Sequence, residues 1–252
     1  MDDGLARHRL WVINDRLTIK AIRDDFKDRK LYIADGHHRY ETSINYRNYM
    51  REKGVYDPDN EYVMMYLADM ADDGLVVFPT HRMVRGLENF DSKNLLEKCS
   101  EYFETEEIEG DIEDRLEEKA AEGKIAFVYY DGSGRYLLTL KSKDIMAQII
   151  PDMSDDYRML DVSVLHSLIL ERIFKIDKEN MANQKNLTYT RSVEEAMGSV
   201  DNGESNCAFF LNPTAVSEIG AVAQNGEKMP QKSTYFYPKL LTGLVMNNMG
   251  DK

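Results

Sequence analysis

Residues 31–46, LYIADGHHRYETSINY, join an apolar run to an Asp-Gly pair and then to a segment that opens with two histidines and an arginine. The apolar run Leu31–Ala34 predicts a buried strand, and the Asp-Gly pair predicts a sharp turn. Apolar residues at helical spacing up to Gly54 predict a helix over about residues 38–53. We expect the rest of the fold to be organised around this strand, turn and helix start.

The predicted helix start is a candidate anion site. Its first backbone N–H groups lack helical partners, and the helix dipole places partial positive charge there. His37, His38 and Arg39 add cationic groups at the end where the dipole disfavours them, so their position makes sense if they meet an anionic ligand. Arg39 also offers a rigid fork of donors that suits phosphate or carboxylate. The structural alternative is a solvated first turn in which Gly36 supplies only backbone freedom.

Asp35 needs a separate explanation, because a carboxylate beside this site would repel phosphate. It could hold Mg²⁺ that bridges to phosphate oxygens, or it could accept the proton of an attacking hydroxyl group. Either role fits phosphoryl transfer. A mixed metal site on Asp35, His37, His38 and the distant His81 is an alternative. Adjacent histidines without HxxxH spacing are a weak metal signal, so we assign no metal ligands.

Two further segments could supply ligands to the same site. Thr80–Arg82 follows an expected strand and could meet the first motif at the end of a sheet, whereas the alternative is a surface turn after Pro79. Lys232–Thr234 follows Pro230 and offers cationic and hydroxyl donors. The alternating polar residues there also fit an edge strand.

Length and composition limit the classes of protein that fit. The chain has 252 residues, 42% of them hydrophobic, which is enough for one large domain or two ordinary ones. A formal net charge of −13 argues against nucleic acid or an anionic membrane as a partner. Two cysteines without CxxC spacing, and no apolar run near the roughly 20 residues of a membrane span, favour a cytoplasmic protein. The P-loop, Rossmann and hydrolase signatures are absent from the sequence.

Hydrophobic patterning predicts an α+β fold. In the first part we expect a strand over His8–Ile13, a helix capped by Asp15, and a hairpin that joins Tyr62–Leu67 to Leu75–Phe78 through a turn at residues 72–74. Further along, strands are expected over residues 126–130, 136–140, 187–190, 207–211 and 233–237, with helices over residues 92–103, 193–200 and 214–223. A helical stripe over residues 165–173 follows Asp161, a plausible helix cap.

Four long motifs, His8–Trp11, Ile33–Thr42, Pro79–Arg82 and Met229–Lys239, carry a resemblance to a known family. Together they resemble the bacterial and archaeal family catalogued as domain of unknown function 1015, and the similarity spans nearly the whole chain. Members of that family are longer at the N-terminus, so this chain resembles a C-terminal portion. The Asp-Gly-His-His-Arg element is similar to one in the ParB/sulfiredoxin-like superfamily, which includes partition-protein nucleotide switches, sulfiredoxin and kinases that phosphorylate free serine.

This resemblance implies a fold and a set of site residues. Residues 1–85 would form a partial ParB/sulfiredoxin-like domain, and residues 86–252 a second, family-specific α+β domain with a mixed sheet. Asp35 would act as the catalytic base with His37 beside it. The phosphate- or nucleotide-binding residues would be Gly36, His37, His38, Arg39, His81, Arg82, Lys232, Ser233 and Thr234.

The expected function is nucleotide-dependent phosphotransfer to a small hydroxylated metabolite, as in a small-molecule kinase. ATP or ADP with Mg²⁺ would be the donor, and serine is the first acceptor to test. Sulfiredoxin-like chemistry is disfavoured because it requires a cysteine near the phosphate motif, and Cys99 has no evident link to it. A non-catalytic, ParB-like nucleotide-binding or interaction protein and a metal-dependent hydrolase are the alternatives. An exposed sheet edge could also pair two copies into a homodimer.

Overall fold

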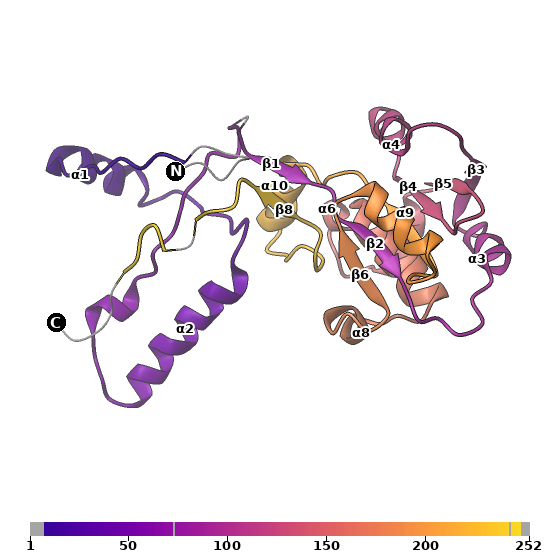
Figure 1. The fold of residues 1–252 in the computed structure, drawn as a ribbon. Helices are drawn as coiled ribbons and strands as arrows, with labels where there is room; N and C mark the ends of the chain where they lie inside the picture. The colour runs from indigo at the N-terminus through magenta and orange to yellow at the C-terminus, as the bar shows by residue number, and fades with distance from the viewer. Residues whose placement is uncertain (1–7, 73, 242, 248–252) are drawn as a thin grey trace. The chain divides into compact units, whose positions relative to one another are not determined.

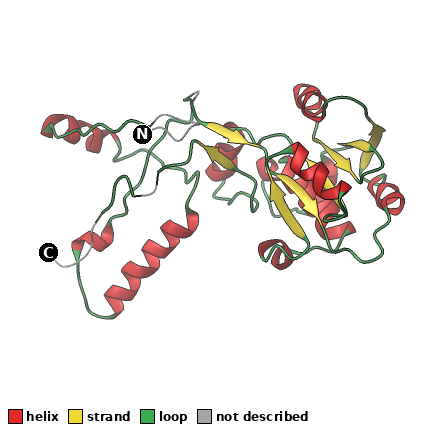
Figure 2. Ribbon diagram, in the orientation of Figure 1, coloured by secondary structure: helices red, strands yellow, loops and turns green. Residues whose placement is uncertain are grey.

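The computed structural model describes residues 8–72, 74–241 and 243–247, and the chain divides into two compact units. Unit 1 comprises Met1–Leu75 together with Pro238–Lys252, and unit 2 comprises Val76–Tyr237. The described elements are shown in Figure 1, and their secondary structure in Figure 2. The predicted α+β class is confirmed.

The regular secondary structure described in unit 1 is helical. Helix α1 spans Arg16–Asp25, and the Asp15 carboxylate accepts from the backbone N–H of Thr18 at 2.7 Å, as the predicted cap requires. Helix α2 spans His37–Glu52, close to the prediction, and the short 3-10 helix η1 spans Pro58–Glu61. Residues of both α-helices remain partly or largely exposed, and none is buried.

Three strands predicted for unit 1 do not form. His8–Ile13, Leu31–Ala34 and Tyr62–Leu67 have an irregular backbone without strand pairing among the described residues. Their apolar side chains lie open, with Trp11 73% exposed. A strand persists only when its N–H and C=O groups pair with a neighbouring strand. The prediction of these strands is therefore wrong. Apolar residues with high β-propensity indicate that a segment can form a strand, but they do not show that a second strand is present to pair with it.

The hairpin predicted between Tyr62–Leu67 and Leu75–Phe78 does not form, and the second segment pairs with another strand. Strand β1, Val76–Phe78, pairs antiparallel with β8, Tyr235–Tyr237, in the register Val76↔Tyr237. Residue 73 of the predicted turn lies outside the described residues. Unit 2 thus begins and ends on two strands that are hydrogen-bonded to each other.

A six-stranded sheet in the order β3-β5-β4-β7-β2-β6 organises unit 2. The strands are β2 (His81–Val84), β3 (Phe103–Glu107), β4 (Ala126–Tyr130), β5 (Arg135–Leu140), β6 (Leu187–Thr190) and β7 (Cys207–Phe210). The predicted hairpin of β4 and β5 is confirmed. Every described strand pair is antiparallel. The sheet of the second domain, which the sequence predicts to be mixed, is therefore antiparallel in the described residues.

The helices of unit 2 connect these strands. They are α3 (Ser92–Cys99), α4 (Ile112–Ala121), α5 (Asp144–Ile149), α6 (Asp155–Arg158), α7 (Asp161–Val164), α8 (Lys178–Ala182), α9 (Val193–Asp201) and α10 (Val216–Gln224). Helix α7 continues directly into a π-helix, η2, over Leu165–Ile173. Such helices are rare and often accompany functional sites. Segment η2 is buried along most of its length, as its apolar stripe predicts.

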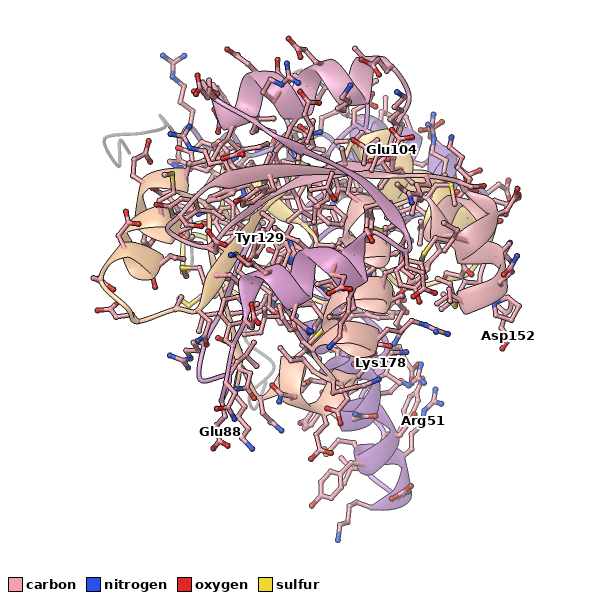
Figure 3. The ribbon with its side chains drawn as sticks, turned by 90° about the vertical axis from the view of Figure 1, so that its right-hand side faces the viewer. Arg51, Glu88, Glu104, Tyr129, Asp152 and Lys178 are labelled. Carbon is pink, nitrogen blue, oxygen red and sulfur yellow. The ribbon has the colours of Figure 1, made fainter. Side chains whose placement is uncertain are left out.

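Two hydrophobic clusters form the core of unit 2, and alternate residues of each strand feed them. Phe127 and Tyr129 of β4 belong to the larger cluster, which includes residues of α3 and η2. Ala126 and Val128 belong to the smaller cluster, which includes residues of α4 and α9. Figure 3 shows Tyr129 among packed side chains of this unit. The sheet therefore packs against helices on each face.

The two compact units divide between Leu75 and Val76 and between Tyr237 and Pro238. Strand β2 pairs with β6 on one side and with β7 on the other, so residues 81–84 belong to the sheet of unit 2. Residues 238–252 belong to unit 1. The boundary between residues 85 and 86 stays a prediction for the domains of the family. Within the described residues, no helix has the length and apolar character needed to span a membrane.

Both cysteine thiols are expected to be unreactive in the folded protein. Cys99 and Cys207 are 0% exposed, and burial raises the pKa of the Cys99 thiol to about 12 and that of Cys207 well above its usual range. Because the thiolate is the reacting form, a disulfide reagent should modify Cys99 and Cys207 only after the protein has unfolded. Labelling in buffer and in denaturant, followed by absorbance, measures this. Rapid modification in buffer would show that either thiol opens readily to solvent.

Candidate functional site

The candidate anion site in unit 1 lies at the first turn of α2. Gly36 precedes the helix with φ 92°, a left-handed conformation that side chains rarely adopt. No side chain caps the helix, and its first turn contains no acidic residue. His37 is partly buried, whereas His38 and Arg39 are exposed. Backbone N–H groups that a cap would otherwise satisfy are thus left for solvent or a ligand.

Close packing adds a second reason for glycine at position 36. A Cβ atom built there would lie 2.8 Å from Nη2 of Arg39, so the guanidinium group lies directly over this residue. His38 Nδ1 lies 3.6 Å from the Glu41 carboxylate, one turn further along α2. The side chains of His38 and Arg39 therefore lie near the helix start and are exposed to solvent.

Substitution of Gly36 by alanine is expected to destabilise the first turn of α2 by about 1–2 kcal/mol, since a side chain disfavours positive φ. Hydrogen exchange of the first amides of α2 measures the effect. Gly54→Ala is the matched control, because Gly54 has φ 72° but no atom within 4 Å of a built Cβ. The control should lose similar stability near the end of the helix and leave the first turn unchanged. Equal exchange of those first amides in wild type and Gly36→Ala would contradict the expectation.

Asp35 is held by two cations of unit 1. Its Oδ2 atom accepts from Lys239 Nζ at 2.9 Å and lies 3.8 Å from Arg39 Nη2. Partial burial alone would raise the pKa of Asp35, but the hydrogen bond and charge of Lys239, the charge of Arg39 and the Gly36 N–H outweigh it. The pKa therefore lies below its usual range, and the carboxylate is ionised at neutral pH. Lys239, from the C-terminal segment, joins the predicted residues here.

His81 and Arg82 of unit 2 are buried instead of exposed, each with 1% of its surface accessible. The Arg82 guanidinium donates to the carbonyl of Thr80 and, at 3.0 Å, to that of Lys232. His81 Nδ1 accepts from the Leu211 N–H at 3.4 Å. Burial, and then the charge of Arg82, lower the pKa of His81 to about 4, so the ring is neutral at pH 7. Arg82 thus stabilises the Lys232–Thr234 loop through a hydrogen bond to the Lys232 carbonyl.

The same loop is fixed by its own side chains. Ser233 is buried and its Oγ donates to the Pro230 carbonyl at 2.7 Å, while Thr214 Oγ1 donates to the Ser233 carbonyl at 3.1 Å. Lys232 adopts φ 55°, an uncommon conformation for a residue with a side chain, and remains exposed. Hydrogen bonds thus hold the loop on both sides of Lys232, which is itself exposed.

A cavity lies beside this loop, within unit 2. Its polar lining comprises Thr80, Arg82, Asp161, Asn212, Thr214, Glu218 and Ser233. Burial, and then the negative charge of Glu218, raise the pKa of Asp161 to about 8. The sequence predicts that Asp161 caps the helix that follows it. This prediction is wrong, because Leu160 occupies the N-cap position and Asp161 is the first residue of α7. Sequence reasoning misses Asn212 and Glu218 as cavity residues. Asn212 lies two residues after strand β7, and a polar residue at that place is a usable signal, whereas Glu218 lies within α10.

The predicted site residues form two groups, one in each unit. Asp35 to Arg39 lie together with Lys239 in unit 1, whereas Arg82 contacts the Lys232–Thr234 loop in unit 2. Across the described residues, no three His, Cys, Asp or Glu side chains gather in a way that could hold a metal ion. The assignment of phosphate ligands stays a prediction.

The fold and the uncapped helix start define an α+β protein with a candidate anion site. The chain belongs to the family described as Protein of unknown function (DUF1015), whose model matches residues 1–163. No curated protein matches the sequence.

Solved structures give distant likenesses. A conserved hypothetical protein from Pyrococcus furiosus has a TM-score of 0.42 and 18% identity, over 81% of this chain and 68% of that chain. A free serine kinase in complex with AMP has a TM-score of 0.44 and 17% identity, over 88% of this chain and 80% of that chain. A mutant of a free serine kinase in complex with ADP has a TM-score of 0.42 and 18% identity, over 81% and 66%. Likenesses at this level carry no argument about activity.

Proposed function

We propose that this protein transfers a phosphoryl group from a nucleotide to a small hydroxylated metabolite, with the phosphates bound at the start of α2. The observation that carries the proposal is the first turn of that helix, which has no side-chain cap and no acidic residue but has His37, His38 and Arg39 beside Gly36. Backbone N–H groups, the helix dipole and a guanidinium fork together favour phosphate oxygens.

In the proposed reaction the metabolite's hydroxyl oxygen attacks the terminal phosphorus of ATP or ADP. A new P–O bond forms, the bond to the departing nucleotide breaks, and the hydroxyl proton passes to the Asp35 carboxylate. The ionised state of Asp35 suits this role. Its carboxylate oxygens also fit Mg²⁺, which would neutralise phosphate charge when bound. Arg39 and His37 would orient the phosphates.

Asp35→Asn provides the test of this reaction. Full-length protein is incubated with ATP or ADP, Mg²⁺ and L-serine or another small alcohol, and products are followed by phosphorus NMR. We expect the substitution to lower turnover by about 10²-fold or more, because asparagine cannot accept the proton. Asp28→Asn, at an exposed carboxylate of the same unit, is the control and should retain full turnover. Turnover that survives Asp35→Asn unchanged would remove Asp35 from the mechanism.

A non-catalytic nucleotide-binding or interaction protein is the second candidate. The observation that favours it is the 2.9 Å contact of Asp35 with Lys239, because a carboxylate paired with an ammonium group and with a lowered pKa is a weak base. Saturable nucleotide binding without turnover of any alcohol would support this reading. Binding should then weaken in Arg39→Ala and be unchanged in Arg29→Ala, where the arginine pairs with Asp25 in α1.

A further inference from the structure

Arg82 is a buried cation without a matching negative charge. Its guanidinium has five N–H donors, of which one reaches the Thr80 carbonyl and another the Lys232 carbonyl. Its Nε atom is buried without a hydrogen-bond partner. Burial lowers the pKa of Arg82 to about 10, so the group stays charged at pH 7, and no carboxylate among the described residues forms an ion pair with it. Buried charges normally have a countercharge.

The charge of Arg82 acts on a second buried group. His166 lies in η2 and is buried, and its Nε2 atom has no hydrogen-bond partner. Burial, and then the charge of Arg82, lower the pKa of His166 well below its usual range, so the ring is neutral at pH 7. A neutral imidazole can donate or accept a hydrogen bond, but it cannot balance the charge of a guanidinium group.

The cavity that Arg82 lines does not supply the countercharge either. Its lining includes the carboxyl groups of Asp161 and Glu218. The pKa of Asp161 is about 8, so at pH 7 this group is mostly protonated and uncharged. Glu218 is exposed, and its Oε2 atom accepts from the Ala215 N–H at 2.8 Å. A negative charge that meets the guanidinium group of Arg82 would therefore come from solution.

The size of the cavity decides which anion fits. The centre of a water molecule has only about 20 Å³ in which to move, and one water needs roughly 10–15 Å³ by this measure. Carboxylate, phosphate and sulfate ions are too large for this space, whereas a halide ion is only slightly larger than water. Water would satisfy free N–H groups of Arg82 but would leave its charge unbalanced. Size and charge together favour a monatomic anion.

We propose that the cavity beside Arg82 in unit 2 binds one chloride ion, held by guanidinium N–H groups that Thr80 and Lys232 do not occupy. Chloride can accept several hydrogen bonds and carries the charge that a water molecule lacks. Because Arg82 donates to the Lys232 carbonyl, the ion would also stabilise the attachment of the Lys232–Thr234 loop. The inference rests on residues of unit 2 alone and is independent of phosphate binding at α2.

Thermal unfolding of the full-length protein tests the proposal. Potassium chloride replaces potassium gluconate at constant ionic strength, so general screening by salt is unchanged, and gluconate is too large for the cavity. We expect the temperature of unfolding to rise with chloride and to saturate, by about 4 °C at a tenfold excess over the dissociation constant. Arg82→Gln keeps N–H donors but has no charge, so this rise should be absent.

Arg172→Gln is the matched control, because Arg172 is exposed in η2, and it should keep the response to chloride. A second measurement needs no variant. Crystals of the wild type grown in sodium bromide should show an anomalous scattering peak in contact with the Arg82 guanidinium. A water molecule at that position in these crystals would overturn the proposal. An absent response to chloride in the wild type, or an equal response in Arg82→Gln, would also overturn it.

Discussion

Arg82→Ala is expected to lower the free energy of unfolding by about 3 kcal/mol. The substitution removes hydrogen bonds to the carbonyls of Thr80 and Lys232 and leaves a space where a fully buried side chain packs against Tyr189. Relief of the buried charge offsets part of this cost, which is why the expected value is not larger. Urea denaturation measures the change as a shift in midpoint at constant slope.

Arg172→Ala, at an exposed arginine of η2, is the control and should change the free energy of unfolding by less than about 0.5 kcal/mol. Arg82→Met separates the two causes, since methionine restores much of the volume but none of the hydrogen bonds. If Arg82→Ala is as stable as the wild type, the guanidinium group does not fasten the Lys232–Thr234 loop in solution.

Asp161→Asn is expected to stabilise the protein increasingly as pH rises. The pKa of Asp161 is about 8 in the folded protein, because of burial and the charge of Glu218, and about 4 in an unfolded chain. Between these values the folded protein holds a proton that the unfolded chain has lost, so the free energy of unfolding of the wild type falls as pH rises. Asparagine has no such proton.

The separation of these two pKa values corresponds to about 5 kcal/mol at about 1.4 kcal/mol for each pH unit. Asp161 is only partly buried at the cavity, so we expect about 2–3 kcal/mol of relative stabilisation between about pH 4 and pH 8. Urea denaturation of both proteins at several pH values measures it. Glu218→Gln should reduce the effect, and Asp152→Asn should show none. A constant stability difference between Asp161→Asn and wild type across this range would contradict the assigned pKa.

Much of unit 2 can be predicted from the sequence because its signals are local. The β4–β5 hairpin has two apolar strands around an Asp-Gly-Ser-Gly turn, and α9 has a serine cap before its apolar stripe. Strand partners are set by contacts between distant segments. The pairing of β1 with β8 links residues 76–78 to 235–237, and no local pattern indicates it. The strands predicted in unit 1 fail for the same reason.

The sequence predicts which residues belong to the helix start of the candidate site, but it does not predict the burial and the neighbours of the other candidate residues. The helix start at Gly36 follows from the Asp-Gly turn and the helical spacing beyond it, and the structure places α2 within one residue of the prediction. The burial of Arg82 does not follow from sequence, because an arginine after a strand is usually exposed. Asp161 reads as a helix cap, and only three-dimensional packing reveals its proximity to Glu218.

The ladder between β1 and β8 has a consequence for how this chain could be divided. The two positions at which the chain enters and leaves unit 2 are neighbours, since Val76 is paired with Tyr237. Unit 2 is therefore one uninterrupted sequence whose ends are joined by hydrogen bonds, as in a domain inserted into a loop of another. Because the entry and exit of unit 2 are adjacent, a short linker between residues 75 and 238 would be long enough to rejoin the chain if unit 2 were removed.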